Sequence, residues 1–265
     1  MLKISAKQGL ASHRLVAGLF SLFVMLGLVA AATPAAAVVI VAPNAQATTE
    51  GANNNSIPFS GTGDFDRYQQ VYGSTHFGAL SGPELITQIA FRPDGSQGAF
   101  GPHSFGNVEI KLSTTSAVPD LLSSTFANNV GADETTVYSG ALSLSSAATG
   151  SGPLDFDVII TLQTPFLYNP TLGNLLFEFV NFSGDSFTTF ALDADNTANN
   201  GVSRLFGETP TSTNGQLSST GLVTQFTTQS NPVVAVPEPS TFLLFASGLG
   251  GLLAVRRRRS QTKAA

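Results

Sequence analysis

Apolar and polar residues alternate with a period of two over much of the chain between residues 64 and 228. Successive side chains of a strand point to opposite faces of a sheet, so this pattern is typical of strands with one buried face. Within Asn107–Ser113, for example, aliphatic residues alternate with Glu109 and Lys111. Clusters of Gly, Pro, Asn or Ser separate such stretches, and no long stretch outside the two terminal segments has a 3.6-residue period. The pattern therefore predicts β structure.

The alternation predicts nine short strands and an all-β fold. Asn174–Phe182 is apolar on both faces, which predicts a central strand. We expect a single antiparallel β-sandwich of jelly-roll or Greek-key type over residues 64–228. The predicted strands are Arg67–Tyr72, Leu85–Phe91, Asn107–Ser113, Thr135–Leu144, Leu154–Leu162, Asn174–Phe182, Ser186–Leu192, Val202–Phe206 and Leu222–Thr227.

The first 47 residues have the layout of a secretory signal peptide. A basic segment, Met1–Arg14, precedes the continuous apolar run Leu15–Ala32, and small residues follow. Two cleavage sites fit the small-x-small rule, one after Ala37 and one at Ala45-Gln46-Ala47. We favour cleavage after Ala47, because Val38–Val41 would otherwise leave an apolar start exposed. An uncleaved N-terminal anchor is the alternative, since eighteen apolar residues are long enough to span a membrane.

Two loosely structured segments are expected to flank the sandwich. Residues 48–63 are rich in Gly and Asn and predict a flexible lead-in. We expect residues 229–235 to form a linker to the C-terminal segment.

The C-terminal segment, residues 236–259, has three parts. An uncharged stretch, Phe242–Val255, predicts a short transmembrane helix of about 21 Å. A buried C-terminal helix with a solvated basic tail is the alternative, but Phe242–Val255 has no polar face. The motif before the helix consists of Val236, Pro237, Glu238, Pro239, Ser240 and Thr241, and a stop-transfer cluster of Arg256, Arg257, Arg258 and Arg259 follows it.

These three parts together resemble the PEP-CTERM sorting signal of Gram-negative bacteria. The resemblance implies that the chain is a substrate of exosortase, an integral membrane enzyme that acts at or near the Pro-Glu-Pro. It also implies that the secretion machinery exports the chain, that the C-terminal helix spans the inner membrane transiently, and that the protein then reaches the cell surface or the extracellular matrix.

The middle of the chain also resembles a recurring cargo type among proteins with this signal. That type has no established activity, so the resemblance transfers no site residues. The segments that carry it are Arg67–Tyr72, Ile89–Pro93, Leu112–Thr115, Phe126–Val130 and Phe166–Pro170.

Composition excludes several classes of function. The chain has no cysteine, which excludes disulfides, thiolate metal sites and a cysteine nucleophile. Between Thr48 and Ala235 there are four basic and sixteen acidic residues, a net charge of −12. A domain of this charge should not bind nucleic acid.

Candidate catalytic and metal-binding residues are sparse. His76 and His103 have no second histidine at helical or strand spacing. Three carboxylate pairs occur, but such pairs are equally typical of a solvated sheet face: Asp64/Asp66, Asp155/Asp157 and Asp193/Asp195. Alternating oxygen ligands at Asp193, Asp195 and Asn199 would suit Ca²⁺, but Asx-rich turns look the same without a metal. We therefore predict no catalytic residues and no cofactor.

The sequence favours an exported, non-enzymatic surface or matrix protein. The first alternative is a polysaccharide-binding sandwich delivered by the same route, with exopolysaccharide as a partner. Sugar platforms need exposed aromatic residues, however, and the chain has no Trp and only four scattered Tyr. An extracellular hydrolase, which would need two opposed carboxylates in a cleft, comes third.

Overall fold

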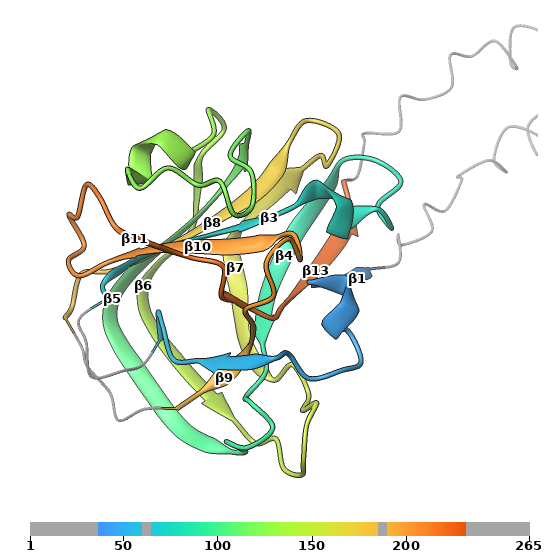
Figure 1. The fold of residues 1–265 in the computed structure, drawn as a ribbon, viewed down its shortest axis with the longest axis vertical. Helices are drawn as coiled ribbons and strands as arrows, with labels where there is room; N and C mark the ends of the chain where they lie inside the picture. The colour runs from blue at the N-terminus through green and yellow to red at the C-terminus, as the bar shows by residue number, and fades with distance from the viewer. Residues whose placement is uncertain (1–36, 60–64, 185–189, 232–265) are drawn as a thin grey trace, which may run out of the picture. The chain divides into compact units, whose positions relative to one another are not determined.

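The computed structural model describes residues 37–59, 65–184 and 190–231 (Figure 1). The chain forms two compact units, Met1–Ala35 and Ala36–Ala265, and the first lies outside the described residues. The predicted signal-peptide core, the C-terminal motif, the transmembrane helix and the arginine cluster also lie outside them. The described residues include no helix with the length and hydrophobicity of a membrane span.

Within the described residues the chain forms thirteen strands. The helical elements there are three short 3-10 turns, η2 (Asn44–Gln46), η3 (Ser74–Phe77) and η4 (Phe126–Asn129). The strands are β1 (Val38–Ala42), β2 (Asn53–Asn55), β3 (Arg67–Tyr72), β4 (Glu84–Phe91), β5 (Phe100–Thr115), β6 (Thr135–Ser146), β7 (Val158–Tyr168), β8 (Asn174–Asn181), β9 (Leu192–Asp195), β10 (Val202–Gly207), β11 (Gln216–Ser218), β12 (Gly221–Leu222) and β13 (Thr224–Ser230).

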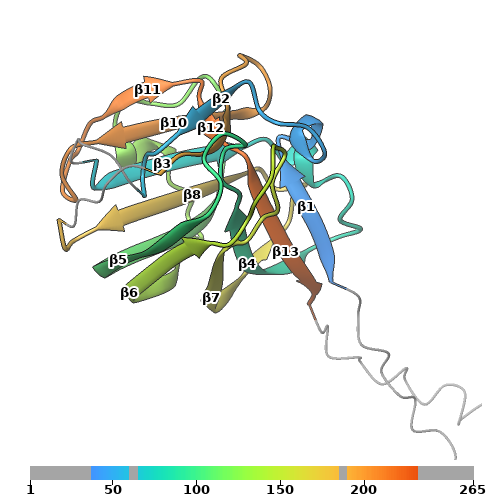
Figure 2. The same cartoon turned by 90° about the horizontal axis from the view of Figure 1, so that it is seen from below.

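All strand pairs are antiparallel and form three sheets. One sheet has the order β1-β13-β4-β7, the second β11-β10-β3-β8-β5-β6 and the third β12-β9-β2. Most neighbours are not consecutive in the chain, so the connections cross repeatedly between sheets. Figure 2 shows β1 and β13 side by side at one edge of the fold.

The four-stranded and six-stranded sheets contribute to one hydrophobic core. Ile89 and Phe226 come from the first sheet, and Val108 and Phe177 from the second. Aromatic rings dominate the centre of this core. The centroid of the Phe59 ring lies 5.1 Å from that of Phe91 and 5.0 Å from that of Phe179. Since the chain has no disulfide, packing of this core carries most of the stability.

Several sequence predictions are confirmed. The fold is all-β and antiparallel, and β3 has the predicted bounds. β8 is buried on both faces and lies between β3 and β5, as its two apolar faces predict. β5 begins at Phe100, seven residues before the predicted start, because three register shifts in its pairing with β6 interrupt the alternation.

The predicted flexible lead-in is wrong for residues 48–59. Asn53–Asn55 forms β2, which pairs with β9, and Phe59 is a fully buried member of the core. No strand was predicted in this segment, because Asn and Gly residues have low strand propensity and β2 is only three residues long. The ordered domain also begins earlier than predicted, since Val38–Ala42 forms β1.

A pair of phenylalanine substitutions tests the place of residue 59 in the core. Phe59→Ala should lower the free energy of unfolding by about 3–5 kcal/mol, because it removes a buried ring and leaves a cavity. Phe182→Ala is the matched control: this residue is 50% exposed, so the loss of its ring should cost only about 1 kcal/mol. Urea unfolding measures both, and equal effects would contradict the packing described here.

Candidate functional site

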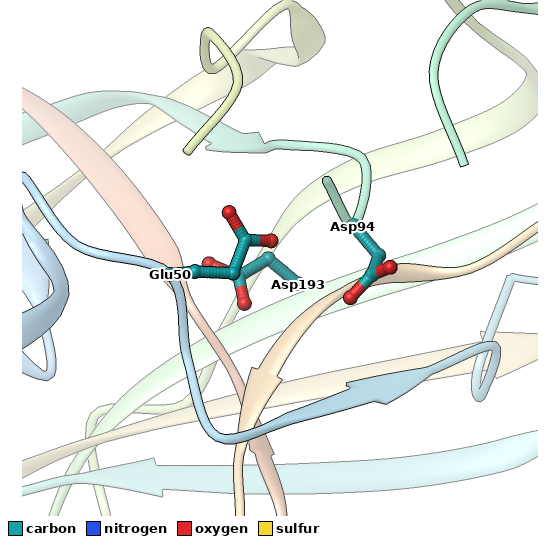
Figure 3. A group of neighbouring side chains, drawn as sticks. All are labelled: Glu50, Asp94 and Asp193. Carbon is teal, nitrogen blue, oxygen red and sulfur yellow. The ribbon is translucent and has the colours of Figure 1, made fainter. Parts of the chain in front are cut away.

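Three carboxyl groups from distant parts of the chain meet beside β9. Glu50 precedes β2, Asp94 follows β4, and Asp193 lies within β9. One oxygen from each lies within 4.8 Å of the others, and Figure 3 shows the three side chains gathered in this way. We call Glu50, Asp94 and Asp193 the carboxylate cluster.

Arg92 neutralises the innermost member of the cluster. Its Nε and Nη2 atoms lie 2.7 Å and 2.6 Å from Oδ2 of Asp193. Both residues are buried, with exposed fractions of 1% for Arg92 and 0% for Asp193. Nη2 also donates to the backbone carbonyls of Gln46, at 2.9 Å, and Thr49, at 2.6 Å. The guanidinium therefore holds the segment before β2 against β4 and β9.

Backbone amides donate to two members of the cluster, whereas Oε2 of Glu50 is buried without a hydrogen-bond partner. The amide of Gly51 donates to Oδ1 of Asp193 at 2.9 Å, and the amide of Gly95 donates to Oε1 of Glu50 at 2.8 Å. A Cβ atom at Gly51 would lie 2.2 Å from the carbonyl oxygen of Ala194. Glycine at this position thus permits the close backbone approach that brings its amide to Asp193.

The electrostatics of Asp193 reflect its burial. Burial raises the pKa of its carboxyl to about 6, Arg92 opposes this rise, and the charge of Glu50 adds to it. Because Asp193 is fully buried, a substrate has no direct access to this carboxyl. The arrangement therefore acts as a structural lock between three segments.

The residues considered as Ca²⁺ ligands have different partners in the structure. Asp193 pairs with Arg92, whereas Oδ1 of Asp195 accepts from the backbone amide of Thr197 at 2.7 Å. Asn199 is exposed, has a φ of 62°, and its amide donates to Asp120 at 2.7 Å. Asp195 thus serves as a turn residue, and Asn199 takes the left-handed conformation common in Asx-rich turns.

The other candidate residues also have structural partners. Nδ1 of His76 lies 3.0 Å from Oδ1 of Asn44, and burial lowers the pKa of His76. The ring of His103 packs 4.8 Å from the ring of Phe190. Oδ2 of Asp157 accepts from the amide of Ala147, while Asp155 is exposed. Asp64 lies outside the described residues.

Sequence reasoning missed Arg92 and Glu50. Arg92 is one of only four basic residues between positions 48 and 235, and it directly follows a buried apolar strand. A basic residue directly after a buried strand is rare in this chain, and this position could have identified Arg92 from the sequence. Nothing local marks Glu50, because its partners Gly95 and Asp193 are far away in the sequence.

Tyrosines offer no aromatic platform for sugar in the described residues. Tyr68, Tyr72 and Tyr168 are fully buried, and the hydroxyl of Tyr138 donates to the carbonyl of Ala141. A sugar-binding platform needs ring faces open to solvent.

The first and last strands of the described domain, β1 and β13, are neighbours in one sheet. β1 and β13 pair in register, with Val38 opposite Thr228 and Ala42 opposite Thr224. Ser230, the last residue of β13, pairs with Glu84 of β4. The chain therefore enters and leaves the domain at the same end of the same sheet. Five residues lie between Ser230 and Val236.

A family model matches residues 235–259, and its description is PEP-CTERM protein-sorting motif. The chain carries a PEP-CTERM sorting signal. The match covers the predicted motif, apolar stretch and arginine cluster, and it implies exosortase as the processing partner and export with membrane-associated sorting to the surface. No curated protein matches the chain.

Removal of Arg92 tests the lock. Arg92→Leu leaves the buried Asp193 without its cation, so the free energy of unfolding should fall by about 3–5 kcal/mol. Lys111→Leu is the control, because Lys111 and Glu109 form a partly exposed pair at 3.3 Å that should contribute less than about 1 kcal/mol. Urea unfolding compares the two, and an Arg92→Leu protein as stable as the control would refute the lock.

The raised pKa of Asp193 predicts a pH dependence of stability. Between pH 3.8 and about 6 the folded state binds a proton that the unfolded state releases, so the contribution of Asp193 to stability rises as pH falls through this window. Asp193→Asn cannot titrate. The stability difference between wild type and Asp193→Asn should therefore be larger at pH 4.5 than at pH 7.5, by at most about 3 kcal/mol. Urea midpoints at the two pH values measure it, and a constant difference would show an unperturbed carboxyl.

Proposed function

We propose that this protein is an exported cell-surface or extracellular-matrix protein whose β-domain has a non-enzymatic structural or interaction role. Exosortase removes the C-terminal signal at or near Pro237–Pro239, after the apolar stretch has held the chain in the inner membrane. The observation that carries the proposal is the sorting motif at residues 235–259.

The position of the domain's ends supports this route. From Ser230 to Pro237 an extended chain reaches at most about 25 Å. An enzyme in the membrane therefore meets its cleavage motif only when the side of the domain that carries β1 and β13 faces the membrane. Because the domain's two ends lie together on that side, an N-terminal and a C-terminal membrane segment can be held at the same time.

The interior of the domain supports a role without catalysis. Within the carboxylate cluster, Asp193 is paired with Arg92 and accepts from the amide of Gly51, and it is fully buried. Three of the four tyrosines are core residues, so polysaccharide binding through aromatic stacking ranks below the structural role. An extracellular hydrolase ranks third. The interleaved strand order is most like that of a Greek-key or jelly-roll sandwich, and we assign that architecture on this basis.

Substitution of the processing motif tests the sorting route. In the exosortase-containing host, a chain with Glu238→Ala and Pro239→Ala should stay full-length in the inner membrane, because the enzyme loses the motif that it reads. Wild-type protein should lose its C-terminal segment and appear at the surface or in the matrix. Cell fractionation and intact mass spectrometry of the tagged protein measure both outcomes.

Pro232→Ala is the matched control, since it also replaces a proline but lies outside the matched motif. It should be processed like wild type. Removal of the exosortase gene should reproduce the result of the motif variant. Normal processing in either the motif variant or the gene deletion would refute sorting by this enzyme.

A further inference from the structure

β1 is an integral part of the domain. All five of its residues pair with β13, from Val38 opposite Thr228 to Ala42 opposite Thr224. Ile40 and Ala42 point into the main core and are buried, whereas Val39 points outward and is 56% exposed. The segment Val38–Ala42 thus has the alternating burial of a native edge strand.

The turn after β1 is tied to the interior as well. Nδ2 of Asn44 donates to the carbonyl of Val41 at 2.8 Å and to that of His76 at 3.0 Å. The carbonyl of Gln46 accepts from Nη2 of the buried Arg92. A buried guanidinium needs such acceptors, because an unpaired buried donor is costly.

The two small-x-small sites have different consequences for this fold. Cleavage after Ala47 would remove β1 and the carbonyl of Gln46, and it would uncover the edge of β13, where Thr224 and Phe226 are fully buried. A bare edge of this kind invites pairing with other chains. Cleavage after Ala37, which is exposed, removes no residue of β1.

We propose that N-terminal processing occurs after Ala37, so that the mature protein begins at Val38 with β1 as its first strand. This inference rests on the export proposed above. The apolar run Val38–Val41 is not a remnant of the signal segment, because it has a place in the sheet and buries Ile40 against the core.

The N-terminus of the exported protein tests the inference directly. The full chain is expressed in an export-competent Gram-negative host, recovered from outside the inner membrane, and its N-terminal peptide is sequenced by mass spectrometry. The expected first residue is Val38. A first residue of Thr48, or an exported chain that retains Met1, overturns the inference but leaves export intact. A chain confined to the cytoplasm overturns both proposals.

Two substitutions at the cleavage sites provide a matched pair. Ala37→Leu removes the small residue that the site after Ala37 requires, so the Val38 terminus should be lost. Ala47→Leu changes an exposed alanine of the folded domain and should leave the Val38 terminus unchanged. The reverse pattern would establish the site after Ala47.

A stability measurement on the mature exported protein gives an independent readout. Ile40→Ala should lower the melting temperature by about 5 °C or more, because Ile40 is buried in the core. Val39→Ala, on the outward face, should change it by about 1 °C or less. If residues 38–47 are absent from the mature protein, both variants yield the same protein as wild type, and identical melting temperatures would overturn the inference.

Discussion

The ion pair between Arg92 and Asp193 is the contact on which the N-terminal part of this fold depends. It joins the residue after β4 to β9, and the same guanidinium holds the backbone at Gln46 and Thr49. A buried pair of this kind gains little net stability over an apolar pair of the same size, but it is costly to break. It therefore specifies where a loop-rich segment must lie, and it ties that segment to two strands that are far away in the sequence.

The sequence predicted the positions of several strands. β8 follows a nearly continuous apolar run, and the predicted positions of β3, β8 and β10 agree with the structure. β1 was missed for a different reason. Its apolar residues follow an apolar signal-like run, so a one-dimensional reading assigns them to that run. Only the pairing with β13, almost two hundred residues away, shows that they belong to the domain.

The carboxylate cluster could not have been predicted from local pattern. Glu50, Asp94 and Asp193 are separated by 44 and 99 residues, and their meeting depends on the order of strands in the sheets. The alternating acidic residues near Asp193 drew attention to a surface metal site. The strand β9 instead buries Asp193 and Asp195, which periodicity alone cannot reveal. The sorting signal, by contrast, needs no long-range contact to be recognised, because its three parts are contiguous in the chain.

The antiparallel pairing of β1 with β13 has a mechanical consequence. Val38 and Thr228 lie opposite each other, so a pulling force applied between the two ends enters the pair at its open end. The hydrogen bonds between β1 and β13 then bear the force one after another, starting at the open end, instead of all at once. Once the N-terminus is free, no tension acts across the β1–β13 pair, and the ladder is no longer loaded from its open end.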